Sequence, residues 1–199
     1  MAKAREERRR ARKAKTFRRR VIALIAVVAV VVALVLFYQF GRPSPEPEPN
    51  KVLLRTSMGD ITIQLYDDMP ITTGNFRNLV KRGVYDNTIF HRVVSNFVVQ
   101  GGDATSKGIS VATIPDELPN KHSNIRGSVA MAKTSEPNSA TSQFYINLKD
   151  NSQDLDSNYS VFGTVIAGME VVDAIGQVAT DAYEKPLQDV TLIKAEFVE

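Results

Sequence analysis

The chain has 199 residues, a net charge of +3 and no cysteine, which excludes a disulfide framework, a cysteine nucleophile and thiolate metal sites. It has only two histidines, His91 and His122, so a histidine-rich metal centre is also excluded and we expect no metal or cofactor. Residues 1–20 carry eleven Lys/Arg against two Glu, whereas residues 51–199 carry thirteen Lys/Arg against eighteen Asp/Glu. The basic character therefore belongs to the N-terminal tail.

Residues 21–40, VIALIAVVAVVVALVLFYQF, form an uncharged stretch of twenty residues. A helix rises about 1.5 Å per residue, so this stretch matches the roughly 30 Å hydrocarbon core of a bilayer. The main alternative is a cleaved signal peptide, which would have a shorter apolar region and a small-residue cleavage site. The stretch ends instead in aromatic residues, which suit a membrane interface. We therefore predict an uncleaved transmembrane helix.

The basic tail sets the expected orientation, because positive residues beside a span stay in the cytoplasm. The tail of residues 1–20 is then cytoplasmic, and the part after the helix is extracytoplasmic. This topology accounts for the charge, so we expect no nucleic-acid partner. Residues 41–50, GRPSPEPEPN, contain four prolines and predict an extended linker. Residues 51–199 form the folded domain, which we expect to be monomeric.

The folded part shows the patterns of many short strands. Hydrophobic alternation and turn residues predict strands over residues 51–57, 60–66, 88–94, 97–100, 127–132, 143–148, 161–166 and 190–198. Helical spacing and terminal glycines predict helices over 70–82 and 169–175. The polar residues 103–126 predict a long surface loop. The strands are mostly consecutive, so we predict a mainly β fold: a closed eight-stranded antiparallel barrel capped by two helices.

The stretch FHRVVSNFVVQGGD, residues 90–103, places a cation within two predicted strands. Taken alone, Arg92 would be an exposed residue on an edge strand, since a buried arginine is costly without a partner. His91 points away from Arg92 along the strand, which favours a structural, hydrogen-bonding histidine over a catalytic base. The Gly-Gly-Asp sequence lacks the spacing of a phosphate-binding loop.

Together with GSVAMAKTSEPNSATSQFYINL (127–148) and LDSNYSVFGTVIAGMEVVDAI (155–175), this stretch resembles the cyclophilins, which are peptidyl-prolyl cis-trans isomerases. The resemblance covers nearly all of residues 51–199, and the form SATSQFYI is similar to the bacterial branch. It implies a groove on the outer face of the barrel that binds proline-containing polypeptides. The resemblance implies Arg92 as the catalytic arginine and Gln100 as the residue that orients it, a proline pocket of Phe97, Val98, Tyr145 and Leu155, backbone contacts from Ala132, Lys133 and Gln143, and Tyr159 near the rim.

This residue set suits the chemistry of prolyl isomerisation. The twisted amide needs a donor aimed at its nitrogen, and no proton transfer or nucleophile is required. We therefore expect an isomerase acting on exported or membrane-proximal proteins. The alternative is a non-catalytic peptide-binding or chaperone module that uses the same groove. Two departures from the family pattern motivate this alternative. Asp154 stands where many eukaryotic cyclophilins have a tryptophan that helps bind cyclosporin, so we predict weak cyclosporin binding, and the 103–113 loop is shorter and poorer in glycine than is usual in the family.

Overall fold

The computed structural model describes residues 2–40 and 49–199 and, within residues 2–40, the side chains of residues 15, 18, 20 and 22–39. The chain divides into two compact units, Met1–Pro47 and Glu48–Glu199, which are described separately. Most of the predicted proline-rich linker, residues 41–48, lies outside the described residues.

In the N-terminal unit the structure describes the helix α1 (Ala2–Phe40), which includes most of the basic tail as well as the apolar stretch. Within it, Ile22–Gln39 has a mean hydropathy of 2.8 and is long and apolar enough to cross a membrane. A signal sequence near the N-terminus meets the same criteria of length and composition. The predicted apolar helix is therefore present, and its role remains a prediction.

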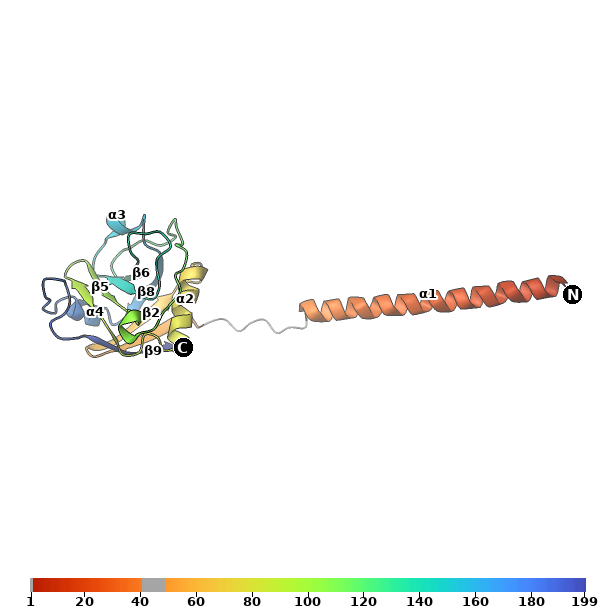
Figure 1. Cartoon of the computed structure of the whole chain (residues 1–199), viewed down its shortest axis with the longest axis horizontal. Helices are drawn as coiled ribbons and strands as arrows, with labels where there is room; N and C mark the ends of the chain where they lie inside the picture. Colours follow the sequence, from red (N-terminus) through yellow and green to blue (C-terminus); the bar gives the residue numbers. More distant parts are fainter. Residues whose placement is uncertain (1, 41–48) are drawn as a thin grey trace. The chain divides into compact units, whose positions relative to one another are not determined.

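The second unit is built on one curled antiparallel sheet (Figure 1). Its strands are β1 (Lys51–Thr56), β2 (Gly59–Leu65), β3 (Thr88–Ile89), β4 (Arg92–Val94), β5 (Val98–Gly101), β6 (Ser128–Met131), β7 (Phe144–Asn147), β8 (Val161–Ala167) and β9 (Thr191–Val198). They follow the order β3-β9-β1-β2-β8-β6-β7-β5-β4. The mainly β class is thus confirmed.

The prediction of a closed eight-stranded barrel is corrected, because the sheet has nine strands and its ladder is open. The predicted strand 88–94 is two strands: β3 pairs with β9, and β4 pairs with β5. These two strands are the opposite edges of the sheet, and only Phe90 and His91 separate them in the chain. Phe90 is fully buried and its N–H donates to the Val190 carbonyl. The connection between β3 and β4 therefore keeps the alternating hydrophobic pattern of a continuous strand. For this reason the sequence did not reveal the break.

Helices flank the sheet, and two of them match the prediction closely. In Figure 1, α2 (Pro70–Lys81) and α4 (Met169–Ile175) lie on opposite sides of the strands. The first packs against β8 and β9, and the second packs against β2. Two short elements were not predicted, the one-turn helix α3 (Ser152–Leu155) and the 3₁₀ helix η1 (Ala104–Lys107).

Alternate residues of the strands β5 and β7 supply two separate apolar clusters. Val99, Phe144 and Ile146 belong to the main core, where Phe144 meets Phe76 edge to face at 5.6 Å. Val98 and Tyr145 face the other side and form a smaller cluster with Ala130, Ala132 and Val161. This period of two is the expected geometry of a strand. It gives the domain a second apolar surface outside its main core.

Candidate active site

The β4–β5 hairpin positions the first pair of candidate residues. Arg92 lies directly opposite Gln100 in the antiparallel register. The chain reverses through Ser95 and Asn96, and Asn96 has a φ of 55°, a left-handed conformation that asparagine tolerates better than most residues. The turn therefore fixes the register that places an arginine beside a glutamine.

The register continues across the sheet and builds the floor of a pocket. Gln100 is paired with Tyr145 on β7, and Tyr145 with Ala130 on β6. Directly opposed residues point to the same face of a sheet, so these side chains share the surface of the smaller apolar cluster. The pocket has a volume of about 240 Å³ and is lined by Arg92, Phe97, Val98, Gln100, Ala132, Lys133, Tyr145, Leu155 and Tyr159.

A chain of polar contacts runs along one side of this pocket. Arg92 Nη1 donates to Gln100 Oε1 at 3.4 Å, and Gln100 Nε2 donates to Gln143 Oε1 at 2.9 Å. Gln143 is the one predicted site residue that does not line the pocket, and it reaches the site through Gln100. Arg92 also donates from Nε to Glu184 Oε2 at 2.6 Å. The arginine is thus held from two sides, by an amide and by a carboxylate.

Tyr145 combines an apolar ring in the pocket with a buried hydroxyl. The hydroxyl donates to Asn124 Oδ1 at 2.8 Å, and Asn124 is held by Asp156 Oδ1, which accepts from its backbone and side-chain nitrogens. Burial raises the pKa of Tyr145 well above its ordinary value, so the phenol stays protonated. Tyr159 meets the Tyr145 ring edge to face at 5.8 Å. The Tyr145 side chain is therefore uncharged and held at its hydroxyl and its ring.

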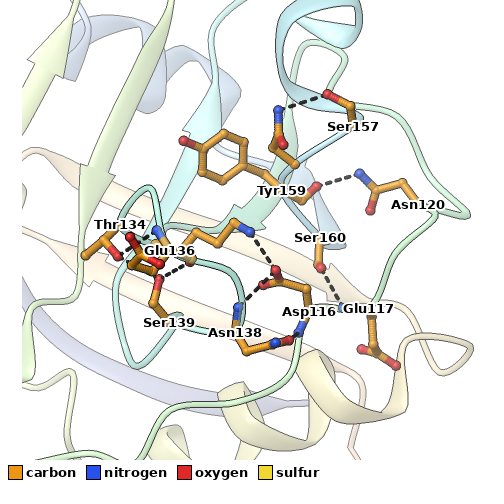
Figure 2. Close-up of polar contacts among 12 residues, drawn as sticks. Asp116, Glu117, Asn120, Thr134, Glu136, Asn138, Ser139, Ser157, Tyr159 and Ser160 are labelled. Carbon is orange, nitrogen blue, oxygen red and sulfur yellow. Dashed lines mark hydrogen bonds and ion pairs between the residues drawn. The ribbon is translucent and has the colours of Figure 1, made fainter.

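Lys133 lines the pocket, but its ammonium group has a partner. Lys133 Nζ donates to Asp116 Oδ2 at 2.6 Å, and the side chains of this ion pair are 10% and 13% exposed. Figure 2 shows Asp116 joined also to Asn138, whose N–H donates to the same oxygen at 3.1 Å. The charge of Lys133 is thereby largely neutralised at the pocket wall.

The segment that contains Asp116 ties several parts of the site together (Figure 2). The Glu117 N–H donates to Ser160 Oγ, and Asn120 Nδ2 donates to the Tyr159 carbonyl. The Glu117 carboxylate accepts from the N–H groups of Ile71 and Thr72 at the start of α2, where a helix has unpaired donors. The predicted loop 103–126 is mostly irregular apart from η1, and its second half is bonded to residues that line or flank the pocket.

Three further residues of the motifs lie outside the pocket lining. Burial lowers the pKa of His91, although Asp103 opposes the effect, and Nδ1 of this histidine is buried with no hydrogen-bond partner in the described part of the chain. Hydrogen bonds with the Gln143 side chain and the Ile89 backbone also oppose the lowering of this pKa, so the ring as a whole has hydrogen-bond partners. Gly102 has a φ of 77°, and a Cβ there would lie 2.8 Å from the Phe144 ring, so close packing explains this glycine. Asp154 lines a separate hollow with residues 149–153.

Sequence reasoning missed Glu184, Asp116 and Asn124, which contact predicted site residues. Glu184 follows Arg92 by 92 positions in the chain, and no local pattern connects the two. Asn124 was assigned to a surface loop but is fully buried. An asparagine within a polar segment gives no signal of burial, so only the folded chain reveals these contacts.

Residues 51–197 match the family model described as cyclophilin type peptidyl-prolyl cis-trans isomerase/CLD. A peptidyl-prolyl cis-trans isomerase of Acinetobacter baylyi is 43% identical over 157 residues, which cover 73% of this chain and 84% of the relative. Peptidyl-prolyl cis-trans isomerase A of Dickeya dadantii is 47% identical over 138 residues, which cover 65% of this chain and 73% of the relative.

A similar solved structure is the cyclophilin type peptidyl-prolyl cis-trans isomerase of Cryptosporidium parvum, determined in the presence of the dipeptide Ala-Pro. Its TM-score is 0.69 and its sequence identity is 29%, with 75% of this chain and 99% of that chain covered. The likeness therefore covers nearly all of that chain and three quarters of this one.

Proposed function

This chain belongs to the cyclophilin-type peptidyl-prolyl cis-trans isomerases, and we propose that its isomerase activity depends on Arg92 in the outer pocket. The observation that supports this proposal is that the Arg92 guanidinium and apolar side chains such as Phe97 and Val98 line the same pocket, which has a volume of about 240 Å³. By analogy with the Ala-Pro dipeptide named for the relative's structure, the occupant is the proline of a polypeptide substrate.

The reaction is rotation about an X-Pro bond, which has a barrier of about 18–20 kcal/mol because the nitrogen lone pair is delocalised into the carbonyl. When the bond twists, that lone pair becomes localised on the nitrogen. A donor aimed at the nitrogen stabilises the twisted state more than either planar state, which is the condition for catalysis. In the proposed mechanism Arg92 is this donor, and Phe97, Val98 and Tyr145 hold the ring.

The remaining candidate residues have supporting roles in this proposal. Gln100 and Gln143 orient the arginine through the polar chain described above. Leu155 and Tyr159 close the ring pocket, and Ala132 with the stem of Lys133 lines the path of the substrate backbone. None of these steps transfers a proton, so the site needs no acid–base pair.

The test is an isomerisation assay on an X-Pro peptide with the wild-type chain and the Arg92→Ala variant. We expect kcat/KM to fall by about two orders of magnitude, the typical effect of removing a preorganised donor. Unchanged activity would refute the role of Arg92. A chain that binds the peptide but shows no turnover in either form would instead support the alternative, a non-catalytic peptide-binding module.

We further propose that α1 anchors the domain to a membrane, with the N-terminus in the cytoplasm and the domain outside. Support comes from the apolar segment Ile22–Gln39 and from the eleven Lys/Arg before it, because positive residues beside a span remain cytoplasmic. Substrates would then be exported proteins or proteins near the membrane.

The absence of cysteine from the sequence makes this topology easy to test. Single cysteines at the exposed positions Lys15 and Ser157 can be labelled in cells with a membrane-impermeant maleimide. We expect Ser157→Cys to react in intact cells and Lys15→Cys to react only after permeabilisation. The reverse pattern would overturn the orientation, and a product shorter than the full 22.0 kDa would indicate a cleaved signal sequence.

A further inference from the structure

The loop that follows α4 reaches Arg92 from outside the pocket. Its ends meet through a hydrogen bond from the Leu187 N–H to the Ala179 carbonyl and an isolated bridge between Thr180 and Pro186. At its base, Asp181 Oδ1 accepts from the N–H groups of Tyr183 and Lys185. The loop is therefore a self-bonded unit that can hold a side chain in place.

Glu184 is the residue that this loop presents to the site. It has a φ of 64°, a left-handed conformation that is unfavourable for a residue with a Cβ. Its N–H donates to the Asp181 carbonyl at 3.1 Å, and its own carbonyl accepts from the Val93 N–H at 2.8 Å. A strained backbone that surrounding contacts maintain is a frequent feature of functional positions. Here the strain places the carboxylate next to Arg92.

The contact with Glu184 fixes the guanidinium in a particular orientation. Glu184 accepts from Nε at 2.6 Å, and Gln100 accepts from Nη1 at 3.4 Å. Among the residues that the structure describes, Nη2 has no hydrogen-bond partner, so it remains available to a substrate. A planar guanidinium held at two of its nitrogens can present the third in only a narrow range of directions.

We propose that Glu184 is a positioning residue for catalysis, which orients Arg92 so that its free guanidinium N–H groups face the bond that rotates. This inference rests on the proposed role of Arg92. Glu184 does not line the pocket, so it acts through the arginine rather than on the substrate. The side chains of Arg92 and Glu184 are 37% and 45% exposed, and solvent screening weakens such pairs, so we expect a moderate effect. Removing the Glu184 carboxylate should loosen Arg92 but leave the pocket lining unchanged.

The test uses the full chain in detergent micelles and compares the Glu184→Gln, Glu184→Gly and Glu184→Asp variants. Gln keeps the shape without the charge, and Gly suits the left-handed backbone while removing the side chain. We expect kcat/KM to fall about three- to tenfold for Gln and Gly, mostly in kcat, with partial recovery for Asp, in keeping with a partly screened charged hydrogen bond. Lys185→Ala, in the same loop, is the matched control and should retain wild-type activity.

A double-mutant cycle shows whether Glu184 acts through Arg92. Glu184→Gln should have no further effect in the Arg92→Ala background, because the group that it positions is gone. NMR gives a readout independent of turnover: the Arg92 Nε–Hε resonance, assigned by its loss in Arg92→Ala, should move upfield and exchange faster with water in Glu184→Gln.

Three results would overturn the proposal while leaving the role of Arg92 intact. One is wild-type kcat/KM in both Glu184→Gln and Glu184→Gly although Arg92→Ala is impaired. The second is an equal loss from Glu184→Gln with and without Arg92, and the third is an unchanged Nε–Hε resonance. If Arg92→Ala itself keeps full activity, the proposed function and this inference both fail, which separates that outcome from the first three.

Discussion

Gln100 lies directly opposite Arg92 on the β4–β5 hairpin, and its amide contacts both Arg92 and Gln143. Its oxygen accepts from the guanidinium while its nitrogen donates to the second glutamine. An amide can make both contacts at once because it carries an acceptor and a donor. The orientation of Arg92 on β4 is therefore coupled through Gln100 to Gln143, which directly precedes β7, the neighbour of β5 on its other edge.

Gln100→Leu should lower kcat/KM about fivefold. The substitution removes one hydrogen bond to a charged group, worth on the order of 1 kcal/mol at a partly exposed site. The measurement is the isomerisation assay, with Gln153→Ala as a control because Gln153 is an exposed glutamine of α3. Activity equal to that of the wild type would show that Gln100 does not orient the arginine.

Tyr145→Phe should reduce stability without abolishing activity. The buried hydroxyl loses its hydrogen bond to Asn124, but Asn124 Oδ1 still accepts from Asn147 Nδ2 at 3.2 Å. We expect a loss of about 1 kcal/mol in the free energy of unfolding, measured by denaturant titration, and kcat/KM within about twofold of the wild type because the ring remains. A tenfold loss of kcat/KM would mean that the hydroxyl takes part in the reaction.

The ion pair of Lys133 and Asp116 predicts a non-additive effect on stability. Asp116→Ala leaves a mostly buried ammonium group without its anion and should cost about 2–3 kcal/mol. The double variant Asp116→Ala/Lys133→Met should lose less, because the stranded charge is gone. Asp189→Ala, which breaks the exposed pair with Lys185, should change stability by less than about 1 kcal/mol. Additive losses in the double variant would contradict this account.

Much of the fold follows from local patterns in the sequence. The alternation of Ile61, Ile63 and Leu65 marks β2, and all three side chains are buried. The spacing of Phe76, Leu79 and Val80 marks the buried face of α2. The break between β3 and β4 could not be predicted in this way, since it depends on which strands pair at the sheet edges. Pairing is a property of the folded chain.

The same distinction applies to the candidate site. The β4–β5 hairpin brings Arg92 and Gln100 together through a turn that the sequence shows, whereas Glu184 reaches Arg92 from a remote loop. Nor does the sequence show that the Lys133 charge is neutralised by Asp116. Contacts between distant segments set the electrostatics of the pocket, so family motifs identify its lining but not the groups that tune it.

The lowered pKa of His91 predicts that the folded domain loses stability in mildly acidic solution. Burial lowers its pKa in the folded state, while in the unfolded chain the pKa is about 6.5. As the pH falls below about 6.5, the unfolded state binds a proton that the folded state does not, so the free energy of unfolding decreases until the folded pKa is reached. The limiting slope is about 1.4 kcal/mol per pH unit, and partial exposure of the ring keeps the loss below it.

Thermal or denaturant unfolding between about pH 7 and pH 5 measures this effect. We expect the wild type to lose stability over that window, whereas His91→Gln, which has no titrating ring, should lose much less. The lower limit of about pH 5 lies above the pKa values of Asp and Glu in the unfolded chain, about 3.9 and 4.3. Carboxylates such as Asp173 and Asp150, whose folded pKa values are lowered by hydrogen bonds with Arg126 and Ser152, therefore lose their contribution mainly below that limit. Equal pH dependence in the wild type and His91→Gln would show that His91 is not the group responsible.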